Sequence, residues 1–222
     1  MRRREAEILT DSLRGEKILD LGCGTGYYLR DGFVGLDISH NMLLKAKRKG
    51  KKLLVLGSAD CLPFKNSSFD SVISMFGVLN HVELNRCMKE VDRVLKPNGI
   101  FIFSIANLYA LPWMIKILRK RGINFLRKKM RKKAGKIRVR IKDKEFSVLT
   151  KYYSLNDLKK SMEGLFEPSF FQGIFVFSSP IYKEKVRYGL KDKLIEKMDS
   201  FFSKFFPFNR FGTYILVVCR KI

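Results

Sequence analysis

The chain has 222 residues, of which 46% are hydrophobic and 30% are charged; this composition supports a sizeable core and excludes a disordered polymer. Its 45 Lys and Arg against 21 Asp and Glu give a formal net charge of +24, which favours polyanionic partners such as nucleic acid or an anionic membrane surface. The basic N-terminus lacks the apolar stretch of a signal peptide, and the uncharged stretch between Lys96 and Lys116 contains two prolines, which disfavours a membrane span.

The cysteines and histidines show no metal-type spacing. There is no C-x-x-C pair, and no cysteine lies near a histidine in a zinc-ligand pattern. We therefore expect no metal, and we expect reduced thiols in a cytoplasmic protein. The residues concerned are Cys23, Cys61, Cys87, Cys219, His40 and His81.

Strand and helix patterns alternate over the first half of the chain. Residues 17–21 form a short apolar run ending at a glycine cluster, as a buried strand followed by a tight turn does. Ser39 can cap a helix that continues to about Lys49. The other predicted elements are a helix over 5–13, strands over 33–37, 52–57 and 69–76, a helix over 83–95 and a strand over 100–106. This alternation predicts a doubly wound, mostly parallel α/β sheet.

The alternation stops near residue 108 and resumes at Ser154, which can cap a helix to about Gly164. Strands over 168–178 and 213–220 complete the predicted sheet. We therefore expect one domain over residues 1–222 that carries two insertions.

The first insertion, residues 113–151, holds 16 basic residues against two acidic ones, for a net charge of +14. Residues 113–133 have a helical pattern. The following residues alternate, with apolar side chains on one predicted face and basic ones on the other, and a turn at Asp143 and Lys144 leads to a return strand over 145–150. The alternating residues are Ile137, Val139 and Ile141 opposite Arg138, Arg140 and Lys142.

The second insertion, residues 183–211, contains a predicted amphipathic helix over 190–206 that ends before Pro207. Its apolar side recurs at helical spacing through Leu190, Leu194, Ile195, Met198, Phe201, Phe202, Phe205 and Phe206. Such a helix can pack over the sheet or lie in a membrane interface, and the sequence leaves both open.

The turn after the first strand carries the strongest chemical signal. Gly22, Gly24 and Gly26 follow Asp20 in a G-x-G-x-G pattern, which lets backbone approach a ligand closely because glycine has no Cβ. Asp37 ends the next strand, where a carboxylate can accept hydrogen bonds from a ribose diol. Tyr27 stands where a diphosphate-binding turn has its third glycine, so a nucleoside ligand without a diphosphate is favoured.

Four runs of this sequence resemble the class I S-adenosylmethionine-dependent methyltransferases, of the kind called methyltransferase domain type 11. They are ILDLGCGTG (18–26), GLDIS (35–39), GSADCLPFKNSSFD (57–70) and LKPNGIF (95–101), and the resemblance covers about residues 16–107. It implies a Rossmann-like sheet of seven strands with the last strand antiparallel. It also implies S-adenosylmethionine as cofactor, with S-adenosylhomocysteine as product.

The resemblance assigns the cofactor contacts by position. Asp20 and the backbone of Gly22 and Gly24 would hold the methionine end, and Asp37 would hold the ribose. The remaining implied contacts are Cys23, Gly26, Tyr28, Ile38, Met42, Ser58, Ala59, Asp60, Met75 and Phe76. Many relatives have an aspartate where this chain has Ser58, so Asp60 or the Ser58 hydroxyl would have to contact the adenine amine.

The acceptor is indicated more weakly. The segment after the fourth strand lacks the N/D-P-P-Y/F pattern of enzymes that methylate base or glutamine amines. His81 follows that strand and can act as a base or be hydrogen-bonded locally at a helix start. GYYL (26–29), VLNH (78–81) and VLTKYYSLNDL (148–158) resemble the tRNA wobble-uridine carboxymethyl methyltransferases, which work with a small activator protein. Lipid and quinone methyltransferases share part of this set.

The basic insertion favours RNA as the acceptor. Arg and Lys side chains there can track phosphates, and tyrosines can stack a flipped base or pack internally. The candidates for RNA contact are Lys128, Lys129, Arg131, Lys132, Lys133, Arg138, Arg140, Lys142 and Tyr152, and the candidate catalytic residues are His81 and Tyr153. Two alternatives stay open, namely methylation of a small apolar or lipid-like acceptor at a membrane surface, and a nucleoside-binding module without catalytic activity.

Overall fold

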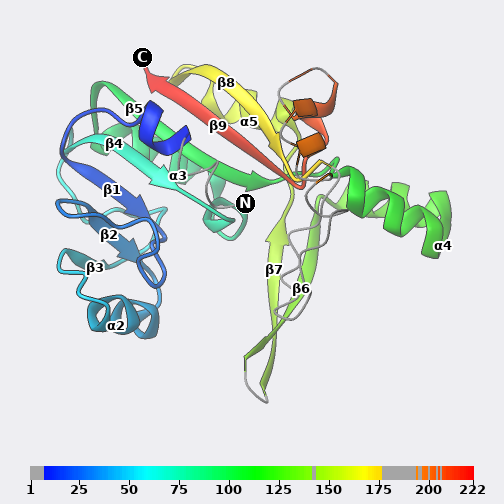
Figure 1. Cartoon of the computed structure of the whole chain (residues 1–222), viewed down its shortest axis with the longest axis horizontal. Helices are drawn as coiled ribbons and strands as arrows, with labels where there is room; N and C mark the ends of the chain where they lie inside the picture. The colour runs from blue at the N-terminus through cyan, green and yellow to red at the C-terminus, as the bar shows by residue number, and fades with distance from the viewer. Residues whose placement is uncertain are drawn as a thin grey trace. The chain divides into compact units, whose positions relative to one another are not determined.

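The structure is a computed structural model that describes residues 8–141, 144–176, 194, 197–199, 201–203, 205 and 207–222, with the backbone alone over 137–141 and 144–146. Figure 1 labels its strands and α-helices. The elements are β1 (Ile18–Leu21), β2 (Val34–Asp37), α2 (His40–Arg48), β3 (Leu54–Leu56), β4 (Phe69–Ser74), η1 (Val78–Asn80), α3 (Leu84–Val94), β5 (Leu95–Ala106), α4 (Leu111–Lys132), β6 (Ala134–Ile141), β7 (Lys144–Lys151), α5 (Leu155–Met162), β8 (Phe166–Ile174), η2 (Phe208–Arg210) and β9 (Tyr214–Lys221).

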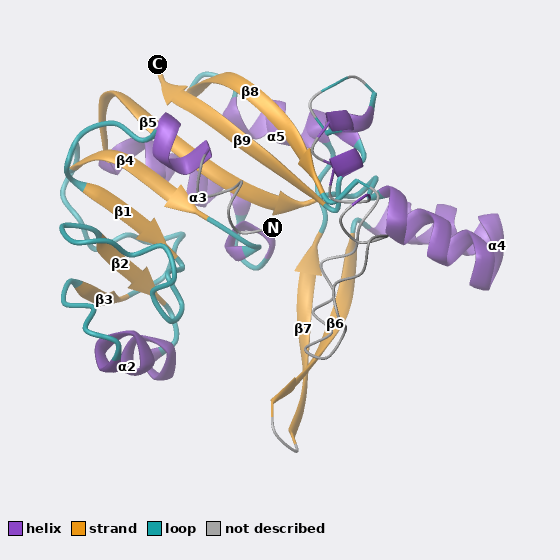
Figure 2. Cartoon of the chain, viewed as in Figure 1, coloured by secondary structure: helices purple, strands orange, loops and turns teal. Residues whose placement is uncertain are grey.

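The seven-stranded sheet has the order β3-β2-β1-β4-β5-β9-β8. Neighbouring strands from β3 to β5 pair in parallel, as the alternation of strands and helices predicts. The last strand, β9, is antiparallel to its neighbours (Figure 2), which confirms the predicted fold class. Every residue of β1 is buried, and this explains why a parallel central strand has an unbroken apolar sequence around a single aspartate.

The chain divides into two compact units. The first contains residues 1–104, 159–170 and 217–222, and the second contains residues 105–158 and 171–216. In the described part of the first unit, Leu19, Val72, Ile73, Phe101 and Phe103 are fully buried and form its core. Within the described residues, no helix is both long and apolar enough to cross a membrane.

Side-chain caps fix the helix starts where the sequence predicts them. The Ser39 hydroxyl accepts a hydrogen bond from Met42 N at the start of α2. At the start of α5, the Ser154 hydroxyl accepts from Asp157 N (3.2 Å) while the Asp157 carboxylate accepts from Ser154 N (2.9 Å). Such a reciprocal pair satisfies two backbone donors that a helix leaves unpaired at its first turn.

Three predicted elements differ from the structure by a break or by more than two residues at one end. Strand β5 starts at Leu95 rather than residue 100, because Leu95 pairs with Phe69 across a register shift. The helix predicted over 113–133 is broken at Gly122, where φ is +74° and a glycine meets no steric penalty. Strand β8 runs over Phe166–Ile174 instead of 168–178, and Phe175 adopts a positive φ directly after it.

The predicted hairpin of the first insertion forms in the second unit. Strands β6 and β7 pair antiparallel from Ala134 opposite Lys151 to Ile141 opposite Lys144. The turn residues Lys142 and Asp143 lie outside the described residues, as do residues 183–193 and parts of the predicted helix over 190–206. Residues 194, 197–199 and 201–202, which lie in that predicted helix, are helical.

Candidate functional site

The glycine turn after β1 is built by left-handed backbone. Gly22, Gly24 and Gly26 have φ values of +76°, +54° and +75°, which L side chains rarely adopt. The amides of Gly22 and Cys23 both donate to the Leu36 carbonyl, at 2.7 and 3.0 Å. The turn therefore starts from β1 and is anchored on β2.

The three glycines differ in what a side chain would meet. A Cβ on Gly22 would lie 2.1 Å from Val78 Cγ2, and one on Gly26 would lie 2.9 Å from Lys51 Cγ. A Cβ on Gly24 would meet nothing within 4 Å. Gly22 therefore allows η1 to pack on the turn, whereas Gly24 faces open space in which a ligand can lie against the backbone.

Asp20 is a buried carboxyl group just before this turn. Its side chain is 2% exposed, and its Oδ2 has no hydrogen-bond partner among the described residues. Burial, with a smaller contribution from the charge of Asp37, raises the pKa of Asp20 from 3.8 to about 7. Because native proteins satisfy nearly all buried polar atoms, this oxygen indicates a missing partner, and a cationic ligand group would suit it.

Asp37 joins the turn to the next helix. One carboxylate oxygen accepts from Gly24 N and the other accepts from Ser39 N, both at 2.8 Å. Beside it, Ile38 is 76% exposed, which is unusual for an isoleucine that follows a buried strand. An apolar side chain in this position can pack on a flat ring, and Met42, half-buried in α2, lies one helical turn further on.

The Cys23 thiol of the turn is buried and inert. Burial, followed by the charges of Asp20 and Asp37, raises its pKa to about 12. A thiol with such a pKa carries almost no thiolate at neutral pH, so Cys23 contributes packing and backbone rather than a nucleophile.

The loop after β3 contains the departure from the family pattern. The Ser58 hydroxyl donates to Asp60 Oδ1 at 2.6 Å, and Cys61 N donates to the Ser58 carbonyl at 3.2 Å. Ala59, between them, is 5% exposed. Ser58 and Asp60 thus act as a pair, in which the serine orients the carboxylate.

A strained aromatic residue lies two residues after the end of β4. Phe76 has a φ of +57°, and its amide donates to the Ser104 hydroxyl at 2.7 Å. Its ring stacks on Tyr28, with centroids 6.3 Å apart, and Met75 beside it is buried. A bulky residue in left-handed backbone persists only where its surroundings hold it, and such strain is concentrated at functional sites.

His81 follows η1 in the first unit. It is exposed, and its amide donates to the Val78 carbonyl at 3.0 Å, so it closes the short helix that packs on Gly22. Tyr153 belongs to the second unit, where its backbone exchanges hydrogen bonds with Ala106 and Leu108 at the end of β5. Backbone hydrogen bonds thus hold both candidate catalytic residues, His81 directly after η1 and Tyr153 beside the end of β5.

Tyr152 packs inside the second unit. Its ring stacks on Trp113 with centroids 6.1 Å apart, and burial, with a smaller contribution from Tyr214, raises its pKa above the usual value of 10. Lys129 Nζ lies 5.4 Å from the centroid of the same Trp113 ring. One face of Tyr152 is therefore already covered, which favours internal packing over base stacking at this residue.

The residues predicted to contact RNA differ in their exposure and pairing. Lys128, Arg131 and Lys132 are exposed, whereas Lys133 pairs with Asp157 at 2.6 Å. The side chains of Arg138 and Arg140, and all of Lys142, lie outside the described residues.

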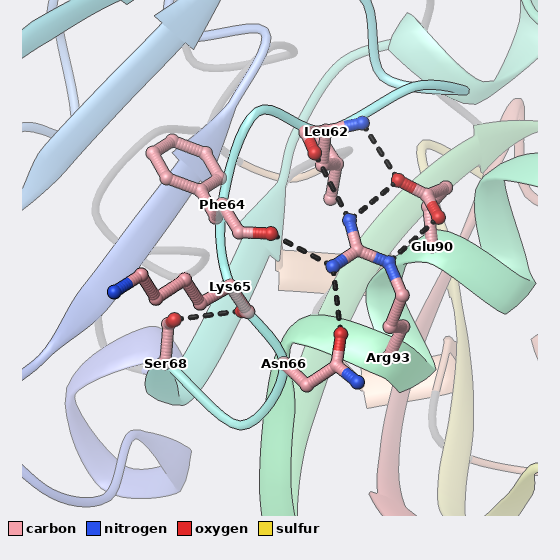
Figure 3. A network of polar contacts seen from close by, with 7 residues as sticks. All are labelled: Leu62, Phe64, Lys65, Asn66, Ser68, Glu90 and Arg93. Carbon is pink, nitrogen blue, oxygen red and sulfur yellow. Dashed lines mark hydrogen bonds and ion pairs between the residues drawn. The ribbon is translucent and has the colours of Figure 1, made fainter.

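Sequence reasoning missed three residues that shape the site. Ser104 fixes the Phe76 amide, and its only signal is a polar residue in the apolar run of β5. Glu90 and Arg93 hold the loop between β3 and β4 (Figure 3). Arg93 stands two residues before the LKPNGIF run, and this position is the only sequence signal for its role.

Comparisons with known proteins include a family model and a curated relative that are both methyltransferases. Residues 19–103 match a family model described as a methyltransferase domain. The whole chain is 38% identical to an uncharacterised protein of Methanocaldococcus jannaschii, of which it covers 83%. Over 84% of its length it is 30% identical to a demethylmenaquinone methyltransferase of Staphylococcus epidermidis, of which it covers 80%.

Solved structures share the fold at lower identity. A methyltransferase dependent on S-adenosylmethionine from Methanosarcina mazei matches with a TM-score of 0.64 at 19% identity, covering 97% of each chain. A methyltransferase from a complex with a Haloferax volcanii methyltransferase activator matches with a TM-score of 0.60 at 19% identity, covering 97% of this chain and 87% of that one.

Proposed function

Because the chain belongs to the class I S-adenosylmethionine-dependent methyltransferases, we propose that the site around the glycine turn binds S-adenosylmethionine and that the acceptor is an RNA. Family membership makes the protein an enzyme and sets aside the inactive binding module. The observation that carries the cofactor site is the unpartnered, buried oxygen of Asp20 beside the open space at Gly24.

The residues present fit this cofactor. Asp20 would bind the cationic methionine end, Asp37 the ribose hydroxyls, and Ser58 with Asp60 the adenine edge. Ile38 offers an exposed apolar surface for a flat base. When bound, S-adenosylmethionine supplies a methyl group on a sulfonium, ready for attack by a nucleophile.

The chain contributes mainly alignment and exclusion of water. Methyl transfer requires the nucleophile, the methyl carbon and the sulfur in line, so a rigid floor matters more than an acid or base. Phe76, held by Ser104 and stacked on Tyr28, would provide that floor. His81 would accept a proton only for acceptors that lose one, and a carboxylate acceptor loses none.

Removing the Asp37 carboxylate tests the ribose contact. We expect Asp37→Ala to weaken S-adenosylmethionine binding by about tenfold or more, because both ribose hydrogen bonds and the anchor on Gly24 N are lost. Isothermal titration calorimetry measures the affinity, and circular dichroism checks that the chain stays folded. Unchanged affinity in a folded variant would place the ribose elsewhere.

The charge of the insertion supports an RNA acceptor. Residues 113–151 carry a net charge of +14, whereas the remaining chain contributes +10 of the total +24. A helix and a two-stranded ribbon, α4 and β6–β7, carry this charge. Basic segments of this kind bind the phosphate backbone and release counterions, so their binding depends steeply on salt.

Neutralising three exposed α4 residues tests this acceptor. We expect Lys128→Gln, Arg131→Gln and Lys132→Gln together to lower the slope of log affinity against log salt for RNA by roughly two to three, and to reduce methyl transfer to total RNA. The matched control changes three exposed lysines elsewhere, Lys52, Lys89 and Lys160, to Gln. If both triple variants methylate RNA as the wild type does, RNA does not bind α4.

A small apolar acceptor at a membrane surface is the second candidate. The relative that methylates demethylmenaquinone favours it. So does α4, where Ile115, Leu118 and Ile123 are 47%, 49% and 48% exposed among basic residues, as in helices that lie in an anionic interface. A tritiated-methyl assay against RNA, protein and lipid extracts separates the two acceptors, and sedimentation with anionic liposomes tests peripheral membrane contact.

A small activator protein is a further proposed partner. The similar fold that was solved with a methyltransferase activator supports the idea. We expect such a protein to co-purify with this chain from the cells that produce it. We also expect the pair to be more active than the chain alone.

A further inference from the structure

A pair of charged residues on α3 holds the loop between β3 and β4 from three sides. Arg93 donates to the carbonyls of Leu62 and Phe64 at 2.9 and 2.7 Å and to Asn66 Oδ1 at 3.0 Å. Glu90 Oε2 accepts from Leu62 N at 2.7 Å. Figure 3 shows the guanidinium in the bend of the loop, with Glu90 on its far side. Both the donor and the acceptor of Leu62 are therefore bound to one helix.

The two side chains also fix each other. Arg93 donates to both Glu90 oxygens, at 2.9 and 2.8 Å, in the fork geometry that arginine makes with a carboxylate. Hydrogen bonds with Arg93 lower the pKa of Glu90, and the same contacts raise that of Arg93, so both stay charged at neutral pH. A lysine could not reproduce three directed contacts with one point charge.

Stability alone does not explain this arrangement. The side chains of Arg93 and Glu90 are 31% and 22% exposed, and a mostly buried ion pair is weak evidence for stability because the cost of desolvation offsets the attraction. What the pair does determine is the path of the loop. The N–H and the carbonyl of Leu62 are both hydrogen-bonded to this pair, and Leu62 stands two residues after Asp60. The Asp60 carboxylate in turn accepts a hydrogen bond from the Ser58 hydroxyl.

We propose that Glu90 and Arg93 are positioning residues that set the affinity and base specificity of the cofactor site by holding the adenine-edge loop, residues 58–66, in its binding conformation. This inference rests on the proposed binding of S-adenosylmethionine at that edge. A loop already ordered before binding avoids an entropic cost on binding, so loosening it weakens the ligand without altering any contact residue. Loosening the loop should leave the rate of methyl transfer itself unchanged, because that step depends on the proposed floor at Phe76.

The experiment compares Arg93→Lys with a matched control, Arg220→Lys, whose arginine on β9 pairs with Glu167 on β8 in the same unit. Calorimetry measures the affinity for S-adenosylhomocysteine and for its inosine counterpart, which lacks the adenine amine. For Arg93→Lys we expect the affinity for the adenine ligand to fall about tenfold and the preference over the inosine ligand to approach one. The rate at saturating cofactor should stay within about twofold of the wild type.

Each other outcome is decisive. A folded Arg93→Lys with wild-type affinity and preference overturns the proposal, as does a wild type that binds both ligands equally. A wild type that binds neither ligand overturns the proposed cofactor site itself. If Arg93→Lys fails to fold, Asn66→Ala removes one contact at an exposed residue, and an affinity loss of roughly threefold, again with reduced preference, is the expected result. Unchanged binding in Asn66→Ala would then count against the proposal.

Discussion

Asp20→Asn is expected to abolish cofactor binding while making the empty protein more stable at pH 8. The asparagine keeps the shape of the side chain but removes the charge that a cationic methionine end requires. Losing one member of a buried charge pair lowers affinity by about a hundredfold or more. Calorimetry with S-adenosylmethionine measures this loss.

The gain in stability follows from the raised pKa of Asp20. Its pKa is about 7 in the folded chain against 3.8 ordinarily, so the folded state holds this proton more tightly. Wild-type stability therefore falls as pH rises from about 4 to about 7 and stays reduced above that range. Asn does not titrate and avoids this loss, which is on the order of 4 kcal/mol at most. Thermal unfolding at pH 8 should show a rise in Tm of several degrees.

The wild type provides the control for this interpretation. Its affinity for S-adenosylmethionine should fall as pH drops below about 7, by up to about tenfold per pH unit, since the empty site becomes protonated. Asp20→Asn should have no such dependence. A variant that binds the cofactor normally, or a wild-type affinity that is flat between pH 5.5 and 8, would remove Asp20 from the site.

Gly24→Ala and Gly22→Ala are expected to fail in opposite ways. At Gly24 a methyl group meets no protein atom within 4 Å, so the chain folds, with a cost of about 1 kcal/mol for the positive φ. The methyl group fills the space that we assign to the ligand, and cofactor affinity should fall about a hundredfold. At Gly22 the methyl group lies 2.1 Å from Val78, so the packing of η1 on the turn is lost and the variant unfolds at a lower temperature.

A second substitution separates steric overlap from strain at these glycines. Val78→Ala removes the atom nearest to the new methyl group, so it should restore much of the Tm of Gly22→Ala and leave Gly24→Ala unchanged. Thermal unfolding and calorimetry on the single and double variants supply the measurements. If Gly24→Ala binds the cofactor with wild-type affinity, the open space above this glycine is not the ligand site.

The sequence predicted that the first five strands exist because each contains a short apolar run, although the start of β5 was wrong. β1 and its glycine turn are the best example, since burial on both faces and three positive φ values leave few alternatives for ILDLGCGTG. Gly122 shows the limit of the pattern. The residues on both sides of it have helical spacing, but glycine permits a break that periodicity does not reveal.

The sequence indicated candidate site residues where a residue type carries chemistry by itself, as for Asp20 and Asp37, and their binding roles stay predictions. It was not predictable where a residue acts through others. Ser104 reaches the Phe76 amide across two neighbouring strands, and Arg93 reaches the loop from a helix about thirty residues away. Such contacts depend on tertiary placement, which local spacing does not encode. The proposed RNA acceptor rests on the charge of residues 113–151, which indicates a class of partner but no acceptor atom.

The double anchor at Asp37 has a consequence for how quickly the proposed contact with the ribose can form. Both of its oxygens already accept backbone amides, so the carboxylate is locked in one rotamer before any ligand arrives. Each oxygen keeps a second lone pair, so two hydroxyls can be received without breaking either existing bond. Docking at this point therefore needs no rearrangement of the turn. The encounter rate, rather than a conformational step, should set how fast this part of the site fills.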